Sequence, residues 1–202
     1  MEFGCGTGRL AARLFADRPS GHHYLGMDLS PVMINLTRSR LAPWGDRAEA
    51  VLVDGSLPLP AKEGSADCVI STFVFDLLDE QYAADVLNDL RRILAPGGRL
   101  CLAGLSPGVG LAERLVSRTW TAIWRFAPQL VGGCRPMTVA ALLDQQHWQV
   151  QHRSRVHSWG LVTEVVIATR RTRNDGPIAD PVRVGERQGR SGPGSVDPLA
   201  LS

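Results

Sequence analysis

The sequence predicts an α/β fold built on a doubly wound, mostly parallel sheet of seven strands, of which the last is antiparallel. Two observations predict it. Short apolar runs typical of buried strands alternate with segments whose apolar residues recur at helical spacing. A glycine-rich turn, GCGTG at 4–8, joins the first strand to the first helix. Strands that alternate with helices pair in parallel, because each crossover helix packs back onto the sheet.

Turn residues and capping residues set the limits of the expected elements. Ser30 and Pro31 supply an N-cap and a first-turn proline for the second helix. APGG at 95–98 ends the long amphipathic helix that precedes it. The run 66–75 is apolar throughout most of its length, as in a strand covered on both faces. We expect strands at 1–3, 23–28, 48–54, 66–75, 99–105, 148–156 and 160–169, and helices at 9–18, 32–42, 79–94, 109–127 and 138–147.

One domain is expected over residues 1–172, with a helical insert at about 109–136. From 173 to 202 the chain is rich in Gly, Pro, Arg and Asp and has few large apolar side chains. Such a segment cannot bury enough surface to offset its ordering entropy, so we expect a disordered tail. No motif in the tail indicates a docking function.

The composition excludes several classes of function. The formal net charge is +2, which gives no electrostatic basis for binding nucleic acid. The 4 cysteines form no CxxC pair, so they indicate reduced thiols in a cytoplasmic protein rather than a zinc site or disulfides. The 5 histidines have no metal-ligand spacing. We find no signal peptide and no apolar window long enough for a transmembrane segment.

The glycine-rich turn has the properties of a nucleotide-binding site. Gly4, Gly6 and Gly8 allow positive φ angles and a close approach of the backbone to a ligand. The helix that follows directs its free N–H groups at the same place. Arg9 occupies the position of the third glycine in the dinucleotide fingerprint, which disfavours NAD and FAD. The alternative is a tight strand–helix turn without a ligand.

Two aspartates end the next two strands. Asp28 can accept hydrogen bonds from both hydroxyls of a ribose. Asp54, followed by Gly55, can accept one from an adenine amino group. The strand ends together predict a crevice that holds an adenosine. The alternatives are a helix N-cap for Asp28, for which Ser30 competes, and a simple Asp-Gly turn for Asp54.

Five blocks in order, from residue 2 to about residue 169, resemble the class I S-adenosylmethionine-dependent methyltransferases, which have a Rossmann-like fold. The nearest branch is the one that acts on small, lipid-like or quinone-like molecules. The blocks are EFGCGTGRLA, YLGMDLSPVMI, VLVDGSLPLP, ADCVISTFVFDLL and LRRILAPGGRL.

The resemblance implies the cofactor S-adenosylmethionine and assigns binding roles residue by residue. At the methionine end these are Glu2, Gly4, Cys5, Gly6, Ser71 and Thr72. At the adenosine end they are Asp28, Leu29, Asp54 and Gly55. Phe73 also matches the substrate-facing end of the fourth strand, although we expect Phe73 and Phe75 to be core residues more than substrate contacts.

The function implied by the resemblance is transfer of a methyl group to a small, apolar acceptor by in-line displacement. The alternative is a non-catalytic S-adenosylmethionine-binding protein or a degenerate relative of the same fold. A nucleotide-dependent oxidoreductase is a third candidate, which Arg9 disfavours. No catalytic base is assigned. Asp76 is a candidate base, but helix N-capping is its expected role, with Asp79 as a rival.

The insert is expected to decide the substrate. On a helix over 109–127, Arg114, Arg118 and Arg125 share one face. One interpretation is a lid that packs its apolar face on the core. The other is a peripheral contact with a membrane surface, which basic and Trp-rich amphipathic helices favour. The apolar residues expected largely opposite the arginines are Leu111, Leu115, Trp120, Ile123 and Trp124.

The first strand is truncated relative to the family pattern, because only Met1, Glu2 and Phe3 precede the turn. A shortened central strand loses ladder hydrogen bonds and part of the core. Three explanations are open: a true start further upstream, a fragment, or a degenerate relative. We favour the first, because the binding residues downstream are intact.

Overall fold

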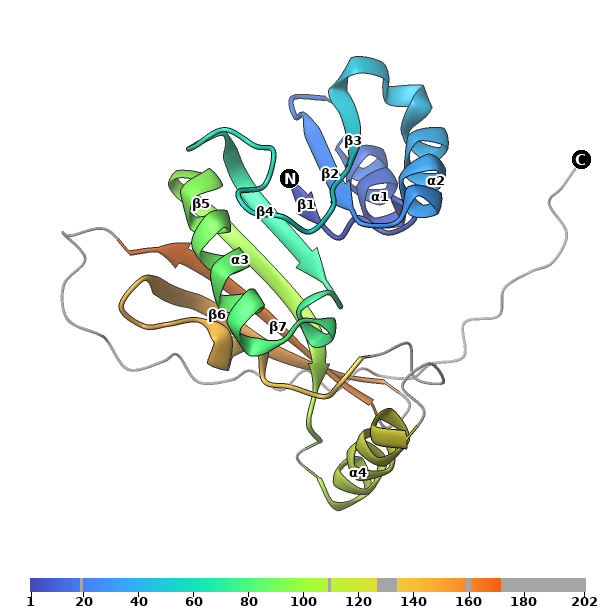
Figure 1. Ribbon diagram of the computed structural model, residues 1–202, viewed down its shortest axis with the longest axis vertical. Helices are drawn as coiled ribbons and strands as arrows, with labels where there is room; N and C mark the ends of the chain where they lie inside the picture. The colour runs from blue at the N-terminus through green and yellow to red at the C-terminus, as the bar shows by residue number, and fades with distance from the viewer. Residues whose placement is uncertain (19, 109, 127–133, 159–160, 172–202) are drawn as a thin grey trace, which may run out of the picture.

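A computed structural model describes residues 1–18, 20–108, 110–126, 134–158 and 161–171. Its centre is a seven-stranded sheet in the order β3-β2-β1-β4-β5-β7-β6 (Figure 1). Neighbouring strands from β3 to β5 pair in parallel, and β7 pairs antiparallel with both β5 and β6. The predicted fold class is confirmed. The strands are β1 Glu2–Phe3, β2 Tyr24–Asp28, β3 Ala48–Leu52, β4 Ala66–Thr72, β5 Leu94–Ser106, β6 Trp148–Ser158 and β7 Leu161–Arg170.

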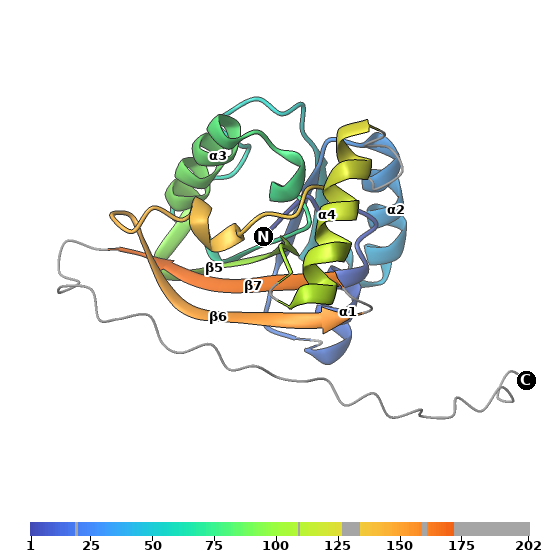
Figure 2. The same cartoon turned by 90° about the horizontal axis from the view of Figure 1, so that it is seen from below.

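Helices cover both faces of the sheet, α1 and α2 on one side and α3 on the other (Figures 1 and 2). On β2, Tyr24 and Met27 are three residues apart and therefore point to opposite faces. Tyr24 packs with Phe15 of α1 and Ile34 of α2, whereas Met27 belongs to the larger core beneath α3. The helices are α1 Arg9–Asp17, α2 Pro31–Leu41, α3 Glu80–Ile93 and α4 Leu111–Phe126, with short 3₁₀ segments η1 Ala42–Arg47, η2 Phe75–Leu77 and η4 Val139–Leu142.

Side-chain caps begin two of the helices. The Ser30 hydroxyl accepts a hydrogen bond from Met33 N at 3.4 Å, and Pro31 is the first residue of α2, as predicted. Asp79 caps α3 by accepting a hydrogen bond from Tyr82 N at 2.8 Å. The expected capping role of Asp76 is therefore wrong, because that residue lies in η2 and its side chain is buried.

Several expected element boundaries are wrong, including the end of the strand expected at 48–54, which stops at Leu52. The helix expected at 138–147 is only η4 and a turn, because the Asp144 carboxylate accepts from Gln146 N and so competes with helical bonding. The strand expected at 66–75 ends at Thr72, where Phe73 adopts a positive φ of 55°. β5 begins directly after α3, so 95–98 ends the helix as predicted but belongs to the strand.

The predicted tail at 173–202 and residues 127–133 of the insert lie outside the described residues. Among the helices that the structure describes, none is long and apolar enough to cross a membrane.

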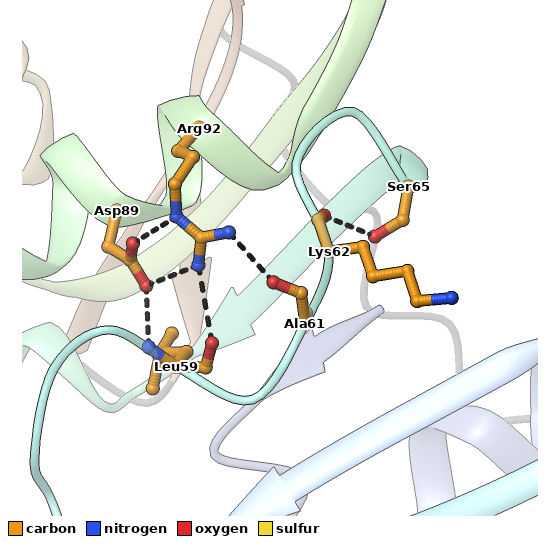
Figure 3. Close-up of polar contacts among 6 residues, drawn as sticks. All are labelled: Leu59, Ala61, Lys62, Ser65, Asp89 and Arg92. Carbon is orange, nitrogen blue, oxygen red and sulfur yellow. Dashed lines mark hydrogen bonds and ion pairs between the residues drawn. The ribbon is translucent and has the colours of Figure 1, made fainter.

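The loop between β3 and β4 is held against α3 by hydrogen bonds to Arg92 and Asp89, which form an ion pair within that helix (Figure 3). Arg92 contacts Asp89 at 2.6 Å and donates to the carbonyls of Ala61 and Leu59 at 2.8 and 3.2 Å. Asp89 in turn accepts from Leu59 N at 2.7 Å. Lys62 points away from this network. The network holds the loop that contains Asp54 against the body of the fold.

We predict that Arg92→Lys lowers the free energy of unfolding by about 1–2 kcal/mol, because an ammonium group cannot reach the carboxylate and both carbonyls at once. Urea denaturation measures the change. The matched control is Arg13→Lys, since Arg13 pairs with Asp17 on the exposed surface of α1 and should tolerate the change. Equal losses for the two variants would contradict the role given to Arg92.

Candidate cofactor-binding site

The glycine-rich turn packs tightly on two sides and is open on the third. A Cβ at Gly4, where φ is 75°, would overlap the Val74 side chain. A Cβ at Gly8, where φ is 70°, would lie 2.9 Å from the Thr37 hydroxyl oxygen. At Gly6, where φ is 51°, no atom of the described chain lies within 4 Å of that position. The turn therefore offers its backbone to a ligand at Gly6.

Asp28 holds this turn in place. Its Oδ2 accepts a hydrogen bond from Gly6 N at 2.8 Å, and its Oδ1 accepts one from Ser30 N at 2.9 Å. The Thr37 hydroxyl donates to Gly6 O at 2.8 Å. Ser30 is the N-cap of α2, so Asp28 does not have that role. Each carboxylate oxygen keeps acceptor capacity, because a carboxylate has about four lone-pair sites.

Glu2 lies beneath the turn and is buried. Its Oε2 accepts a hydrogen bond from the Tyr24 hydroxyl at 2.6 Å. Burial raises the pKa of Glu2 to about 7, and the hydrogen bond from Tyr24 opposes that rise. The site therefore contains a carboxyl group whose charge changes near neutral pH.

The predicted adenine end brings Leu29 and Gly55 together. A Cβ at Gly55 would lie 3.5 Å from Leu29 Cδ2, and Gly55 O accepts a hydrogen bond from the Tyr82 hydroxyl at 2.7 Å. Asp54 is exposed, and its Oδ1 accepts from Ser56 N at 2.9 Å. The hydrogen bonds from Ser56 lower the pKa of Asp54. Asp54 thus forms the local turn that was its alternative interpretation, and its Oδ1 takes the hydrogen bonds from both the backbone and the hydroxyl of Ser56.

The carboxyl end of β4 contains an orphaned hydroxyl and a strained aromatic residue. Ser71 is buried, and its Oγ has no hydrogen-bond partner among the described residues. Thr72 is half-buried and pairs with Ala103 of β5. Phe75 is a core residue, as expected, but Phe73 is 45% exposed, so a core role for Phe73 is wrong. A bulky residue at positive φ is strained, and such strain concentrates at functional sites.

Asp76 supports the end of β5. Its Oδ2 accepts a hydrogen bond from Leu105 N at 2.8 Å, and a Cβ at Gly104 would overlap its Oδ1. Burial raises the pKa of Asp76 to about 6. The side chain is enclosed by the chain itself, which suits a positioning residue better than a base in contact with an acceptor.

Sequence reasoning missed four side chains that shape the site: Tyr24, Thr37, Val74 and Tyr82. Thr37 could have been found, because a polar residue interrupts the buried face that Ile34 and Leu41 form on α2. The others have ordinary apolar or aromatic character, and their roles depend on contacts between distant segments. Cys5 is buried and its thiol lies 3.8 Å from the Thr37 hydroxyl, so only its backbone is available to a ligand.

The site thus joins a glycine turn, a carboxylate at the end of the second strand and an Asp-Gly turn that follows the third. Residues 1–100 match a family model described as a methyltransferase domain. Residues 1–100 thus form a methyltransferase domain, and the curated relatives support the class I S-adenosylmethionine-dependent branch. The resemblance stated from the sequence is confirmed.

Relatives of this family share both sequence and fold with the chain. It is 36% identical over 132 residues to the demethylmenaquinone methyltransferase of Clavibacter sepedonicus, covering 65% of this chain and 50% of that protein. It is 32% identical over 120 residues to the enzyme of the same name from Thermus thermophilus, covering 59% of this chain and 53% of that protein. The chain thus spans about half the length of these curated relatives.

A crystal structure of a SAM-dependent methyltransferase from Methanosarcina mazei has a similar fold. The TM-score is 0.63 at 16% sequence identity, over 83% of this chain and 89% of that one. Within the described residues, no group of three or more His, Cys, Asp and Glu side chains could hold a metal ion.

We predict that Gly4→Ala destabilises the fold by about 1–3 kcal/mol more than Gly6→Ala. Both substitutions strain a positive φ, but only the first forces a methyl group into Val74. Thermal and urea denaturation of the two variants measure the difference. Because Gly6→Ala meets no chain atom, it also serves as the matched control, and an equal loss at both positions would contradict the packing described for the turn.

Proposed function

We propose that the chain binds S-adenosylmethionine at the carboxyl ends of β1 to β4 and transfers a methyl group to a small, apolar acceptor by in-line displacement. The observation that supports this most directly is the bond between Gly6 N and Asp28, which sets a glycine turn and an acidic strand end around one opening. The cofactor, when bound, supplies a methyl group already activated on a positively charged sulfur.

Asp28 is proposed to accept hydrogen bonds from the ribose hydroxyls, since its carboxylate is fixed at the rim of the turn. Leu29 and Gly55, which lie next to each other, would together form one wall against the adenine ring, and the nearby Oδ2 of Asp54 would accept from its amino group. The Tyr82 hydroxyl supports this end by holding Gly55 O.

The methionine portion is proposed to lie over the backbone of residues 4–6, with Glu2 below it. The negative charge of Glu2 would stabilise a cationic ligand above the turn. Ser71 has an unused buried hydroxyl at the end of β4, adjacent to Thr72, and fits a polar group of the ligand. These assignments use the residues that the sequence predicted for the methionine end.

The work of the protein in this reaction is alignment rather than nucleophilic attack. Holding an acceptor in line with the reacting methyl group can lower the barrier by roughly 7–11 kcal/mol. Phe73, half-exposed beside Thr72, is proposed to contact the acceptor. Asp76 is proposed to position the end of β5 through Leu105, and no described residue is assigned as a general base.

An apolar, quinone-like acceptor is favoured by the relatives, two of which are named for demethylmenaquinone. On α4, Leu115 is 68% and Phe126 is 89% exposed, and these side chains could reach a membrane that contains such an acceptor. The alternative is a non-catalytic protein of the same fold. Incubation with S-adenosylmethionine and demethylmenaquinone distinguishes the two, because only an enzyme yields S-adenosylhomocysteine and a methylated quinone.

We predict that the chain binds S-adenosylmethionine and that Asp28→Asn weakens this binding about tenfold or more, because a hydrogen bond to a charged acceptor is lost. Isothermal titration calorimetry measures both affinities. Asp85→Asn is the matched control, since among the described residues Asp85 accepts hydrogen bonds from Gln81 alone, on the exposed side of α3. If a folded wild-type chain bound no S-adenosylmethionine, the proposed function would be wrong.

We also predict that the affinity for S-adenosylmethionine rises between pH 6 and pH 8. A cationic ligand lowers the pKa of Glu2 from about 7, so binding releases a proton and is favoured as the pH increases. Calorimetry at several pH values should give a flatter profile for Glu2→Gln. Tyr24→Phe should move the midpoint to higher pH, because the hydrogen bond that lowers the pKa of Glu2 is removed. A profile that Glu2→Gln leaves unchanged would contradict this role.

A further inference from the structure

A pocket of about 770 Å³ lies between α4 and the backbone that follows β5. In Figure 1, α4 stands beyond the carboxyl end of β5, apart from the other helices. The pocket does not include any of the residues proposed to bind the cofactor. It is lined by residues of α4 between Arg114 and Phe126, by Pro107 and Gly108 after β5, and by Pro136.

Three arginine side chains line this one pocket. Arg114, Arg118 and Arg125 recur at spacings of four and seven residues, which places them on one face of α4. None of the three guanidinium groups forms a hydrogen bond or an ion pair with the part of the chain that the structure describes. Like charges that share a helix face repel one another. An anion in the pocket would offset this repulsion.

The pocket is held in shape by contacts on either side of α4. Gly108 N donates to the Ser117 hydroxyl at 2.9 Å, which ties the segment after β5 to the helix. The Trp120 indole N–H donates to Cys134 O at 2.9 Å, which ties the helix to the segment that ends at Pro136. The arginines therefore face walls of fixed position rather than open solvent alone.

The same segments connect the pocket to the acceptor end of the proposed active site. Arg135 N donates to Asp76 O at 3.3 Å, and Met137 N donates to Leu105 O at 2.7 Å. Pro136 lies between these two anchors and lines the pocket. A molecule that reaches from the end of β4 past the end of β5 would meet the arginines.

We propose that this pocket binds the anionic group, a phosphate or a carboxylate, of an amphiphilic acceptor. This inference rests on the proposed function and adds a charged group to the apolar acceptor. Guanidinium groups bind both kinds of oxyanion through paired hydrogen bonds. Phe126, Ala122 and the two prolines give the pocket apolar surface beside the charges, which suits an acceptor with an apolar body.

The test is titration of the full chain with hexyl phosphate, a soluble anionic amphiphile, and with neutral hexyl glucoside. The expected result is binding of the phosphate alone, weakened about tenfold by Arg118→Gln and less by Arg118→Lys. Arg114→Gln and Arg125→Gln should have the same effect as Arg118→Gln. The matched control is Arg13→Gln, which removes one positive charge from α1 and should leave the affinity unchanged.

No binding of hexyl phosphate, equal binding of the glucoside, or an equal loss in Arg13→Gln would overturn the proposal. A separate arm uses vesicles of phosphatidylglycerol and phosphatidylcholine. Vesicle binding without binding of hexyl phosphate would identify a membrane-surface patch and would also overturn it. The same variants are titrated with S-adenosylmethionine, which they should bind like the wild type. If the wild type does not bind S-adenosylmethionine, the proposed function is wrong. The hexyl phosphate titration would still decide whether the pocket binds an anion.

Discussion

The whole site depends on hydrogen bonds that run from the glycine turn to the end of β2. β1 has two residues, too few to fix the direction of the chain that follows it. The turn extends this pairing: Gly4 N and Cys5 N both donate to Met27 O at 2.9 Å, and Gly6 N donates to Asp28. Three consecutive backbone donors are thereby aimed at one strand end. This is how so short a central strand positions the turn.

The charged side chains near the glycine turn are acidic, whereas those at the far end of the proposed active site are basic. Glu2 and Asp28 lie together beneath and beside the turn, and the charge of Asp28 contributes to the raised pKa of Glu2. The arginines of α4 lie beyond β5. Electrostatic potentials of opposite sign attract ligands of opposite charge. In the proposed arrangement the acidic end attracts a cationic cofactor, and the basic end attracts an anionic acceptor.

The sequence predicted the parts of the site that depend on local rules. Gly6 and Asp28 follow from the rule that ligands bind at the carboxyl ends of parallel strands. The strain at Phe73 and the burial of Asp76 could not be predicted, because both depend on how η2 packs on β5. The helical wheel of α4 also grouped Leu115 with Trp120, yet Leu115 is exposed and Trp120 is half-buried. A wheel gives relative positions on a helix, whereas the orientation of that helix is set by tertiary contacts.

The turns after β1 and β4 form a single packing unit. Gly4 has no side chain, and Val74 occupies the space that one would fill. The residue before Val74 is Phe73, whose N–H donates to Ala103 O at 2.8 Å and whose positive φ costs about 1–3 kcal/mol. Strain of this size persists only where neighbouring contacts fix the backbone. The contact of Val74 with Gly4 is one of them, so the residue proposed to contact the acceptor and the turn proposed to bind the cofactor are held in place by the same packing.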